Sequence, residues 1–328
     1  YLTDATSHPG YDPARLLAMD DLPDEDIQAE PCGQEALARL RTGLGDLGKA
    51  LVIGAPGRMG GVNYAPRLSA QAKRDALTIA TAEVERQAAD AAARTICWLY
   101  FVEGIDEVVD DILLEQHYTR VVVAADCYLP VRWTSFDGYL GSFRSRRRWA
   151  IRRELTAAAD AGVSIDLHGP EVLGPELAEL ELQWRHKYGR QATLEQTLCD
   201  YQALREHIGP ALHVFVARQA GRAIGFITFL EDAGVWWARF PGFDYSAEQQ
   251  LYLYFNLLFY RPIQVAMDRR ITAISYSISA YATKCSRGCS PRHLLAYVRL
   301  PDGADLDSHL RVVDRAQRRR FERIGRRY

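Results

Sequence analysis

Three segments of the sequence carry side chains that could do chemistry, and the first is residues 142–154. Within it, Arg144, Arg148 and Arg152 recur at every fourth position. On a helix this spacing places the three guanidinium groups in one stripe, and such a stripe suits phosphate groups through bidentate contacts. The alternative is a solvated face whose arginines pair with Glu154 and other acids.

The second segment, residues 236–245, reads as an aromatic strand that runs into a Pro-Gly turn. It places Arg239, Asp244 and Tyr245 around that turn. A buried sheet explains the two tryptophans at its start. It does not explain Arg239, because a cation within an apolar strand needs a partner or a ligand.

The third segment, residues 275–292, reads as a strand that continues into an exposed loop carrying Lys284, Arg287 and Gly288. The chain has 40 Lys and Arg residues, and only four of them are lysine. A lysine in this loop therefore indicates that the position requires a point charge or a titratable amine. An ordinary surface loop is the alternative.

The common catalytic fingerprints are absent from the sequence. It has no G-x-S-x-G elbow, Walker loop, H-E-x-x-H motif or G-x-G-x-x-G after a strand, which disfavours hydrolase triads, P-loop ATPases, zincins and Rossmann oxidoreductases. The six cysteines form no four-ligand zinc set, so we expect no metal. We also expect no bound cofactor. They are interpreted as reduced thiols of a cytoplasmic protein.

Composition sets wider limits. The chain has 328 residues, 48% hydrophobic and 25% charged, which is typical of a globular protein with one large core or two modest ones. The formal net charge of −2 favours a local contact with an anion over a large nucleic-acid footprint. No apolar run reaches the ~18 residues that a membrane span needs.

Hydrophobic periodicity and turn residues then predict the helices and strands that carry these three segments. Residues 1–31, which are acidic and rich in proline, are expected to form a loosely packed lead-in. In the first half we predict helices and strands in βαβαβ order, which indicates a mixed α/β module. The helices are at 34–44, 69–94 and 106–115, and the strands at 47–53, 96–102 and 118–131.

The second half is predicted to form another module. Its helices are expected at 142–161, 175–186, 194–206 and 247–268, and its strands at 213–218, 223–231, 234–240, 272–278 and 293–300. An exposed, arginine-rich helix at 315–327 would end the chain. The fold class is thus mixed α/β (α+β), with modules at residues 1–134 and 135–328 and all five strands of the second half in one sheet.

The order of the three segments resembles the FemAB-like group of the GNAT acyltransferase superfamily, over about residues 45–300. Members carry Phe-Asp-x-Phe-Leu and Ser-x-x-Arg-Arg-x-x-Ile-Arg-Arg-Glu, to which residues 136–140 and 145–154 of this chain are similar. They also carry Tyr-x-Arg-Tyr-x-Gly, Phe-Glu-x-x-Tyr-Tyr and His-Lys-x-x-Arg-Gly-x-x-Pro. Residues 237–242, 255–260 and 283–291 correspond to these three motifs.

The resemblance implies two tandem GNAT-like modules and transfer of an activated acyl group to an amine of a small molecule or peptide. Aminoacyl-tRNA is the favoured donor, with its phosphates on Arg144, Arg148 and Arg152 and on the arginine-rich tail. An acyl-CoA or carrier-protein donor is an alternative. A non-catalytic binding module of the same fold is another.

The resemblance also suggests roles for single residues. Lys284 and Arg287 would face one negative centre, the donor phosphate or the developing oxyanion. We expect Lys284→Ala to lose activity while stability stays unchanged. The catalytic candidates are Lys284, Asp244, Tyr245 and Tyr254, and the substrate-binding candidates are Arg239, Asn256, Arg287 and Gly288. Asn256 and Thr283 replace the family's Glu and His, so neither position supplies an acid or base.

Overall fold

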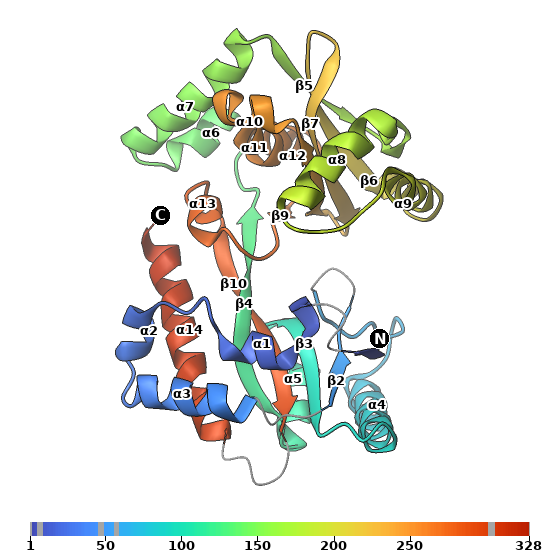
Figure 1. Ribbon diagram of the computed structural model, residues 1–328, viewed down its shortest axis with the longest axis vertical. Coiled ribbons are helices and arrows are strands. Elements are labelled where there is room, and N and C mark those ends of the chain that lie inside the picture. Colours follow the sequence, from blue (N-terminus) through green and yellow to red (C-terminus); the bar gives the residue numbers. More distant parts are fainter. Residues whose placement is uncertain (1, 5–8, 45–48, 56–58, 301–305, 328) are drawn as a thin grey trace. The chain divides into compact units, whose positions relative to one another are not determined.

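The computed structural model describes residues 2–4, 9–44, 49–55, 59–300 and 306–327 (Figure 1). The chain divides into two compact units that are not continuous in sequence. Unit 1 consists of Tyr1–Cys127, Ile278–Cys285 and Ser290–Tyr328, and unit 2 of Tyr128–Ser277 and Ser286–Cys289.

The strands of unit 1 lie in the order β1-β2-β3-β10-β4. Strand β2 runs parallel to β3, and β10 runs antiparallel to β3. The bounds are β1 (Leu2–Asp4), β2 (Ala50–Ile53), β3 (Thr95–Val102), β4 (Thr119–Pro130) and β10 (Ser290–Arg299). Strand β10, expected in the second module, therefore completes the first.

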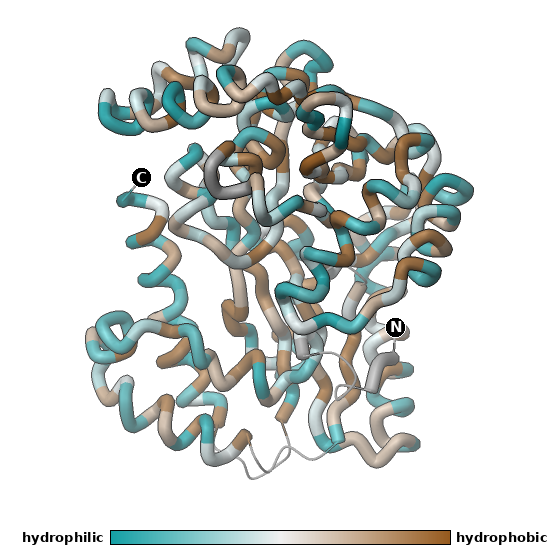
Figure 2. Tube along the Cα trace, turned by 45° about the horizontal axis from the view of Figure 1, so that its top comes forward, coloured by the Kyte–Doolittle hydropathy of each residue, from teal (hydrophilic) through white to brown (hydrophobic). Residues whose placement is uncertain are grey.

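Alternation along these strands builds two cores, because successive side chains point to opposite faces. Cys97 and Leu99 of β3 pack with α1–α3 and α14, whereas Ile96 and Trp98 pack with α4 and α5. The helices are α1 (Pro13–Ala18), α2 (Asp24–Gln28), α3 (Gly33–Leu44), α4 (Ala70–Asp90), α5 (Glu107–Glu115), α13 (Tyr281–Cys285) and α14 (Asp307–Arg327). Figure 2 shows hydrophobic residues along the strands and polar residues recurring along the helices.

Two expectations about the ends of the chain were wrong. The lead-in forms α1 and α2, and its Leu17 and Ile27 are fully buried in the core of unit 1. Helix α14 begins at Asp307 and buries Leu310, Val313 and Phe321. Both segments are amphipathic, and the acidic or basic residues between the apolar positions obscured that pattern.

In unit 2, strands β5-β6-β7-β8 form an antiparallel meander, β9 is parallel to β8, and the end of β4 pairs with β9. The strands are β5 (Val163–His168), β6 (Leu212–Gln219), β7 (Arg222–Asp232), β8 (Val235–Phe243) and β9 (Ala273–Ser275). The helices are α6 (Phe136–Gly141), α7 (Ser145–Asp160), α8 (Pro175–Lys187), α9 (Leu194–His207), α10 (Tyr245–Leu251), α11 (Leu253–Phe255) and α12 (Arg261–Asp268).

The structure confirms the mixed α/β class and corrects several details. The unit boundary lies at 127/128 rather than 134/135, and residues 290–328 return to unit 1. The predicted helix 247–268 is interrupted at Tyr252, which has φ 50° and ψ 37°, and it contains a π-helical turn at Asn256–Tyr260. Strand β5 was not predicted, and α13 occupies part of the expected 283–291 loop.

Within the described ranges, no helix is long and apolar enough to cross a membrane. No group of three or more His, Cys, Asp or Glu side chains in those ranges could hold a metal ion.

Candidate functional site

A buried ion pair lies at the centre of the predicted motifs of unit 2. Arg287 Nη2 donates to Glu154 of α7, at 2.9 Å from Oε1 and 3.0 Å from Oε2. The hydroxyl of Tyr260 also donates to Glu154, and the Arg287 guanidinium lies 3.8 Å from the Phe255 ring centroid. Burial alone would lower the pKa of Arg287, but Tyr260 and Glu154 raise it. Arg287 is therefore a buried structural cation and was wrongly expected to sit on an exposed loop.

Asn256 joins α7 to the start of α11. Its Nδ2 lies 3.1 Å from the carbonyl oxygens of Glu154 and Tyr252 and 3.3 Å from that of Leu251. The side chain is buried at 3% exposure, so its donors are used within the protein. This geometry makes Asn256 a positioning residue and speaks against the substrate contact expected for it.

Gly288 turns the chain beside the ion pair. Its φ of +94° is strained for any other residue, and a Cβ there would meet Leu129 and Phe143 at 3.3 and 3.4 Å. Tyr139, which is fully buried, donates its hydroxyl to the carbonyl of Arg287 at 2.9 Å. Desolvation raises the pKa of Tyr139 well above its ordinary value. Gly288 thus approaches protein side chains where approach to a ligand was predicted.

Lys284 belongs to α13 in unit 1. It is 5% exposed, and its Nζ donates to the carbonyl of Ile278 at 2.7 Å. This differs from the predicted surface loop. A buried, hydrogen-bonded ammonium contributes to folding, so Lys284→Ala would also change stability.

The candidates that follow β8 have separate surroundings. Arg239 is exposed on the strand. Asp244 directly precedes α10; its Oδ1 accepts from the Ser246 backbone at 3.0 Å and its Oδ2 pairs with Arg222. The hydrogen bond from Ser246 lowers the pKa of Asp244, which makes this carboxylate a weak proton acceptor. Its position is that of a helix cap.

Tyr245 and Tyr254 are half-buried and both pack near Phe243, with ring centroids 6.1 and 6.3 Å from its own. Lys187 Nζ lies 3.7 Å from the Tyr245 ring centroid. Both phenols are thus held by aromatic packing at the start of the interrupted helix.

The arginines of α7 are not neutralised. Arg144 is the N-cap, Arg148 donates to the Phe143 carbonyl, and Arg152 is exposed. Only Arg148 and Arg152 of the predicted stripe are therefore helical. Among the residues that the structure describes, no carboxylate forms an ion pair with Arg144, Arg146, Arg147, Arg148, Arg152 or Arg153. Glu154, the expected partner, is occupied by Arg287.

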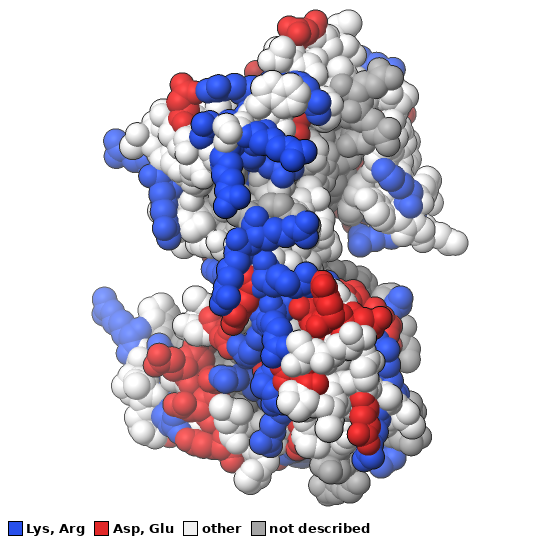
Figure 3. All heavy atoms as spheres, turned by 90° about the vertical axis from the view of Figure 1, so that its left-hand side faces the viewer, with Lys and Arg blue, Asp and Glu red and all other residues white. Residues whose placement is uncertain are grey.

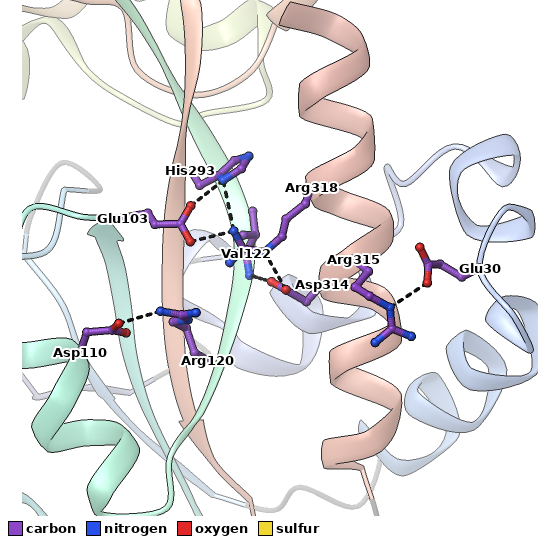
Figure 4. Close-up of polar contacts among 9 residues, drawn as sticks. All are labelled: Glu30, Glu103, Asp110, Arg120, Val122, His293, Asp314, Arg315 and Arg318. Carbon is purple, nitrogen blue, oxygen red and sulfur yellow. Dashed lines mark hydrogen bonds and ion pairs between the residues drawn. The ribbon is translucent and has the colours of Figure 1, made fainter. Parts of the chain in front are cut away.

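Unlike the arginines of α7, many arginines of α14 form ion pairs with carboxylates. Glu30 accepts from Arg315 and Arg319, Asp26 from Arg323, and Glu103 from Arg318. Figure 4 shows contacts from Glu103 to both His293 and Arg318. Figure 3 shows regions of the surface where red and blue side chains lie next to one another and others where blue side chains gather. Part of the arginine-rich tail, expected to hold phosphates, is thus paired with the acidic lead-in.

Sequence reasoning missed Glu154, Tyr260 and Tyr139 as parts of one network. The motif spacing contained Glu154 and Tyr260, but no periodicity could reveal that both meet Arg287. Tyr139 had a signal, because it stands in the Phe-Asp-x-Phe-Leu motif and a buried tyrosine requires a hydrogen-bond partner.

These features define a class: a mixed α/β protein in which helix α7 is tied by buried polar contacts to the segment after α13. The profile of the FemAB-like family, described as peptidoglycan biosynthesis/recognition, matches residues 64–318. The chain belongs to this family, as its motifs predicted.

Solved structures share the fold. The C-terminal domain of a proposed lysylphosphatidylglycerol synthetase from Agrobacterium fabrum aligns with a TM-score of 0.54 and 12% identity, covering 91% of this chain and 94% of that one. FemX aligns with a TM-score of 0.54 and 11% identity over 77% and 81% of the two chains. L-PGS from Bacillus licheniformis aligns with a TM-score of 0.51 and 11% identity, covering 82% of this chain and 82% of that one. No curated protein matches the chain.

Proposed function

We propose that this protein is an acyltransferase that forms an amide bond in peptidoglycan biosynthesis, with aminoacyl-tRNA as the favoured donor. The amine nitrogen of the acceptor attacks the acyl carbonyl, a C–N bond forms, and the ester C–O bond to the donor breaks. The amine proton leaves with the donor hydroxyl. Family membership and similarity to FemX support this reaction class.

The observation that carries the donor assignment is the set of unneutralised arginines on α7. Arg144 and Arg152 are exposed, and Arg148 is half-buried. Guanidinium groups without carboxylate partners keep their charge available for phosphate. Arg144, Arg148 and Arg152 would bind the phosphates of the donor. The paired arginines of α14 leave little net charge for the same purpose.

The acceptor would be an amine of a peptide or small molecule. Tyr245 and Tyr254 would orient the amine, and exposed Arg239 would contact an acceptor carboxylate or phosphate. Lys284 would act on the developing charge only if the Ile278 carbonyl released its ammonium group. The reaction would take place in the cytoplasm, where aminoacyl-tRNA is made.

Product formation tests the reaction class. Purified protein is mixed with a labelled aminoacyl-tRNA and a peptidoglycan precursor peptide, with parallel mixtures that contain acyl-CoA or an acylated carrier protein. We expect labelled amide with aminoacyl-tRNA, and none after ribonuclease treatment. Product only with a thioester donor would replace the donor assignment, and no product with any donor would favour the non-catalytic binding module.

Arginine variants test the donor site. The triple variant of Arg144, Arg148 and Arg152 to Gln should weaken donor binding, and each lost phosphate contact should reduce the slope of log affinity against log salt by about one. Arg326→Gln is the matched control, because Arg326 is exposed but paired with Glu322. Unchanged affinity and salt slope in the triple variant would show that these arginines form only a solvated face and bind no phosphate.

A further inference from the structure

The exposed face of α7 carries an aromatic residue among its unpaired arginines. Trp149 is 63% exposed, which is unusual for so large an apolar side chain. With Arg152, Arg153, Thr156, Ala157 and Asp160 it lines a shallow cavity of about 400 Å³. This volume lies within the usual range for small-molecule sites.

Two aromatic rings contact the same guanidinium group. The Cζ atom of Arg153 lies 5.1 Å from the Trp149 ring centroid and 5.8 Å from that of Tyr252. Trp149 and Arg153 are four residues apart and share a helix face. The indole thus packs against Arg153 while most of its surface still faces solvent.

Tyr252, whose ring also faces Arg153, is held in place by a residue outside α7. Tyr252 adopts a left-handed backbone conformation with φ 50° and ψ 37°, which costs free energy for a residue with a side chain. Asn256 Nδ2 contacts both the Tyr252 carbonyl and the carbonyl of Glu154, the neighbour of Arg153. Asn256 therefore holds Tyr252 in place against the helix that carries Trp149 and Arg153.

We propose that Trp149, Arg153 and Tyr252 form a stacking site for the adenine base of a nucleotide-linked acyl donor. The inference deepens the proposed function and rests on it. Indole, phenol and guanidinium planes are the groups on which unpaired bases stack. Arg148 and Arg152, one helical turn apart, supply the charge for the attached phosphate.

The remaining lining residues agree with this assignment. Asp160 is the carboxylate of the cavity, but it lies eleven residues beyond Trp149, about 16 Å along the helix axis. The end near Trp149 therefore stays positive. A membrane surface fits less well, because an interfacial helix presents a row of apolar residues, whereas Ile151 and Ala158 of α7 are buried in the protein.

Adenine next to a phosphate occurs at the 3′ end of tRNA and in coenzyme A, and binding experiments distinguish these sources. Calorimetry would measure the affinity of the whole protein for adenosine 3′,5′-bisphosphate, inorganic pyrophosphate, coenzyme A and a short RNA ending in CCA. Sedimentation with vesicles of phosphatidylcholine and phosphatidylglycerol tests the membrane alternative. These probes need no turnover, so absence of amide product would overturn the proposed function without removing a stacking site.

We expect Trp149→Ala to weaken adenosine bisphosphate binding by about 5- to 100-fold, with pyrophosphate binding unchanged. Trp149→Phe should restore most of the affinity, since it keeps an aromatic face. Trp184→Ala is the matched control, because Trp184 also packs against an arginine, Arg190, at 5.2 Å. Stronger binding of the CCA oligonucleotide than of coenzyme A would identify RNA as the source, and the reverse order would identify coenzyme A.

Equal affinities of the wild-type protein for adenosine bisphosphate and pyrophosphate would overturn the proposal. So would unchanged adenosine bisphosphate affinity in Trp149→Ala, or vesicle binding that needs Trp149 without any nucleotide binding. Near-ultraviolet circular dichroism checks that the variants are folded. Arg153→Lys, which keeps the charge but removes the planar group, should also weaken base binding.

Discussion

Glu154 and Arg287, which are 133 residues apart in the chain, share a buried contact in which one guanidinium nitrogen bonds to both carboxylate oxygens. Their side chains are only 7% and 5% exposed. Each stands in a different family motif, so the two motifs belong to one buried network. In such a network, removing one partner leaves an uncompensated charge.

Removal of one partner should therefore cost more than removal of both. We expect Arg287→Met to lower the free energy of unfolding by about 3–5 kcal/mol, and Glu154→Leu with Arg287→Met to recover much of that loss. Urea denaturation measures each value. Arg144→Met, an exposed control, should stay within roughly 0.5 kcal/mol of the wild type. Additive losses in the double variant would contradict the coupling.

Gly288→Ala should cost more than a positive φ alone explains. Gly162 has φ +69° with open space around its Cβ position, so Gly162→Ala measures the backbone cost, about 1–2 kcal/mol. At Gly288 the new methyl group also meets Leu129 and Phe143, which should add about 1 kcal/mol. Thermal and urea unfolding compare the two variants. Equal losses would mean that the neighbours of Gly288 move aside without cost.

Asn256→Asp should make stability depend on pH. A carboxylate would face three carbonyl oxygens in a buried site, which raises its pKa in the folded state. When the pKa of a group is higher in the folded than in the unfolded state, its contribution to stability is complete below the unfolded pKa. That contribution is lost as the pH rises toward the folded pKa. The loss relative to wild type should thus be larger at pH 8 than at pH 5, by at least about 1 kcal/mol. Asn256→Ala, with no charge, should show a constant loss across this range, and the same constant loss in Asn256→Asp would refute the argument.

Glu103 should contribute to the acid limit of stability in unit 1. Its oxygens accept from His293 and Arg318, each at 2.7 Å (Figure 4), and the hydrogen bond to His293 is the main cause that lowers the pKa of Glu103 to about 2. A lowered folded pKa gives stability that is lost as pH falls from about 4.5 toward 2. After discounting for solvent, this amounts to roughly 1–2 kcal/mol.

Glu103→Gln should accordingly reduce stability at pH 7 and flatten its decline between pH 5 and pH 3. Urea midpoints at several pH values check this. Glu322→Gln serves as control, because that carboxylate is largely exposed beside Arg326. A variant curve parallel to the wild-type curve would show that Glu103 does not titrate in this window.

Local patterns predicted most elements of the fold. Strands β3, β4, β6 and β7 have apolar runs with clear ends, and Ser69 caps α4 as its type suggests. The break at Tyr252 could not be predicted, because it depends on the buried amide of Asn256. The assignment of β10 to unit 1 depends on pairing with β3, which no local window contains.

The candidate site, too, depends on contacts between residues far apart in the sequence, which local patterns do not reveal. The motifs singled out Arg287, Gly288 and Asn256 as ligand contacts, whereas the structure buries Arg287 and Asn256 in contacts within the protein. Burial decides between a structural and a binding role, and a lone sequence does not reveal that Glu154 faces Arg287. The same contact explains why the α7 arginines lack a partner, since the acid nearest to them in sequence is already paired.

The position of β10 between β3 and β4 has a consequence for synthesis on the ribosome. Residues 1–127 emerge before residues 290–299, so their sheet lacks a strand in its interior until the later segment has left the exit tunnel. Most of unit 2 is available earlier. The nascent chain must therefore keep β3 and β4 with unsatisfied edges while the residues between β4 (Thr119–Pro130) and β10 (Ser290–Arg299) are made, almost half of the sequence. Unpaired strand edges invite aggregation in such a state.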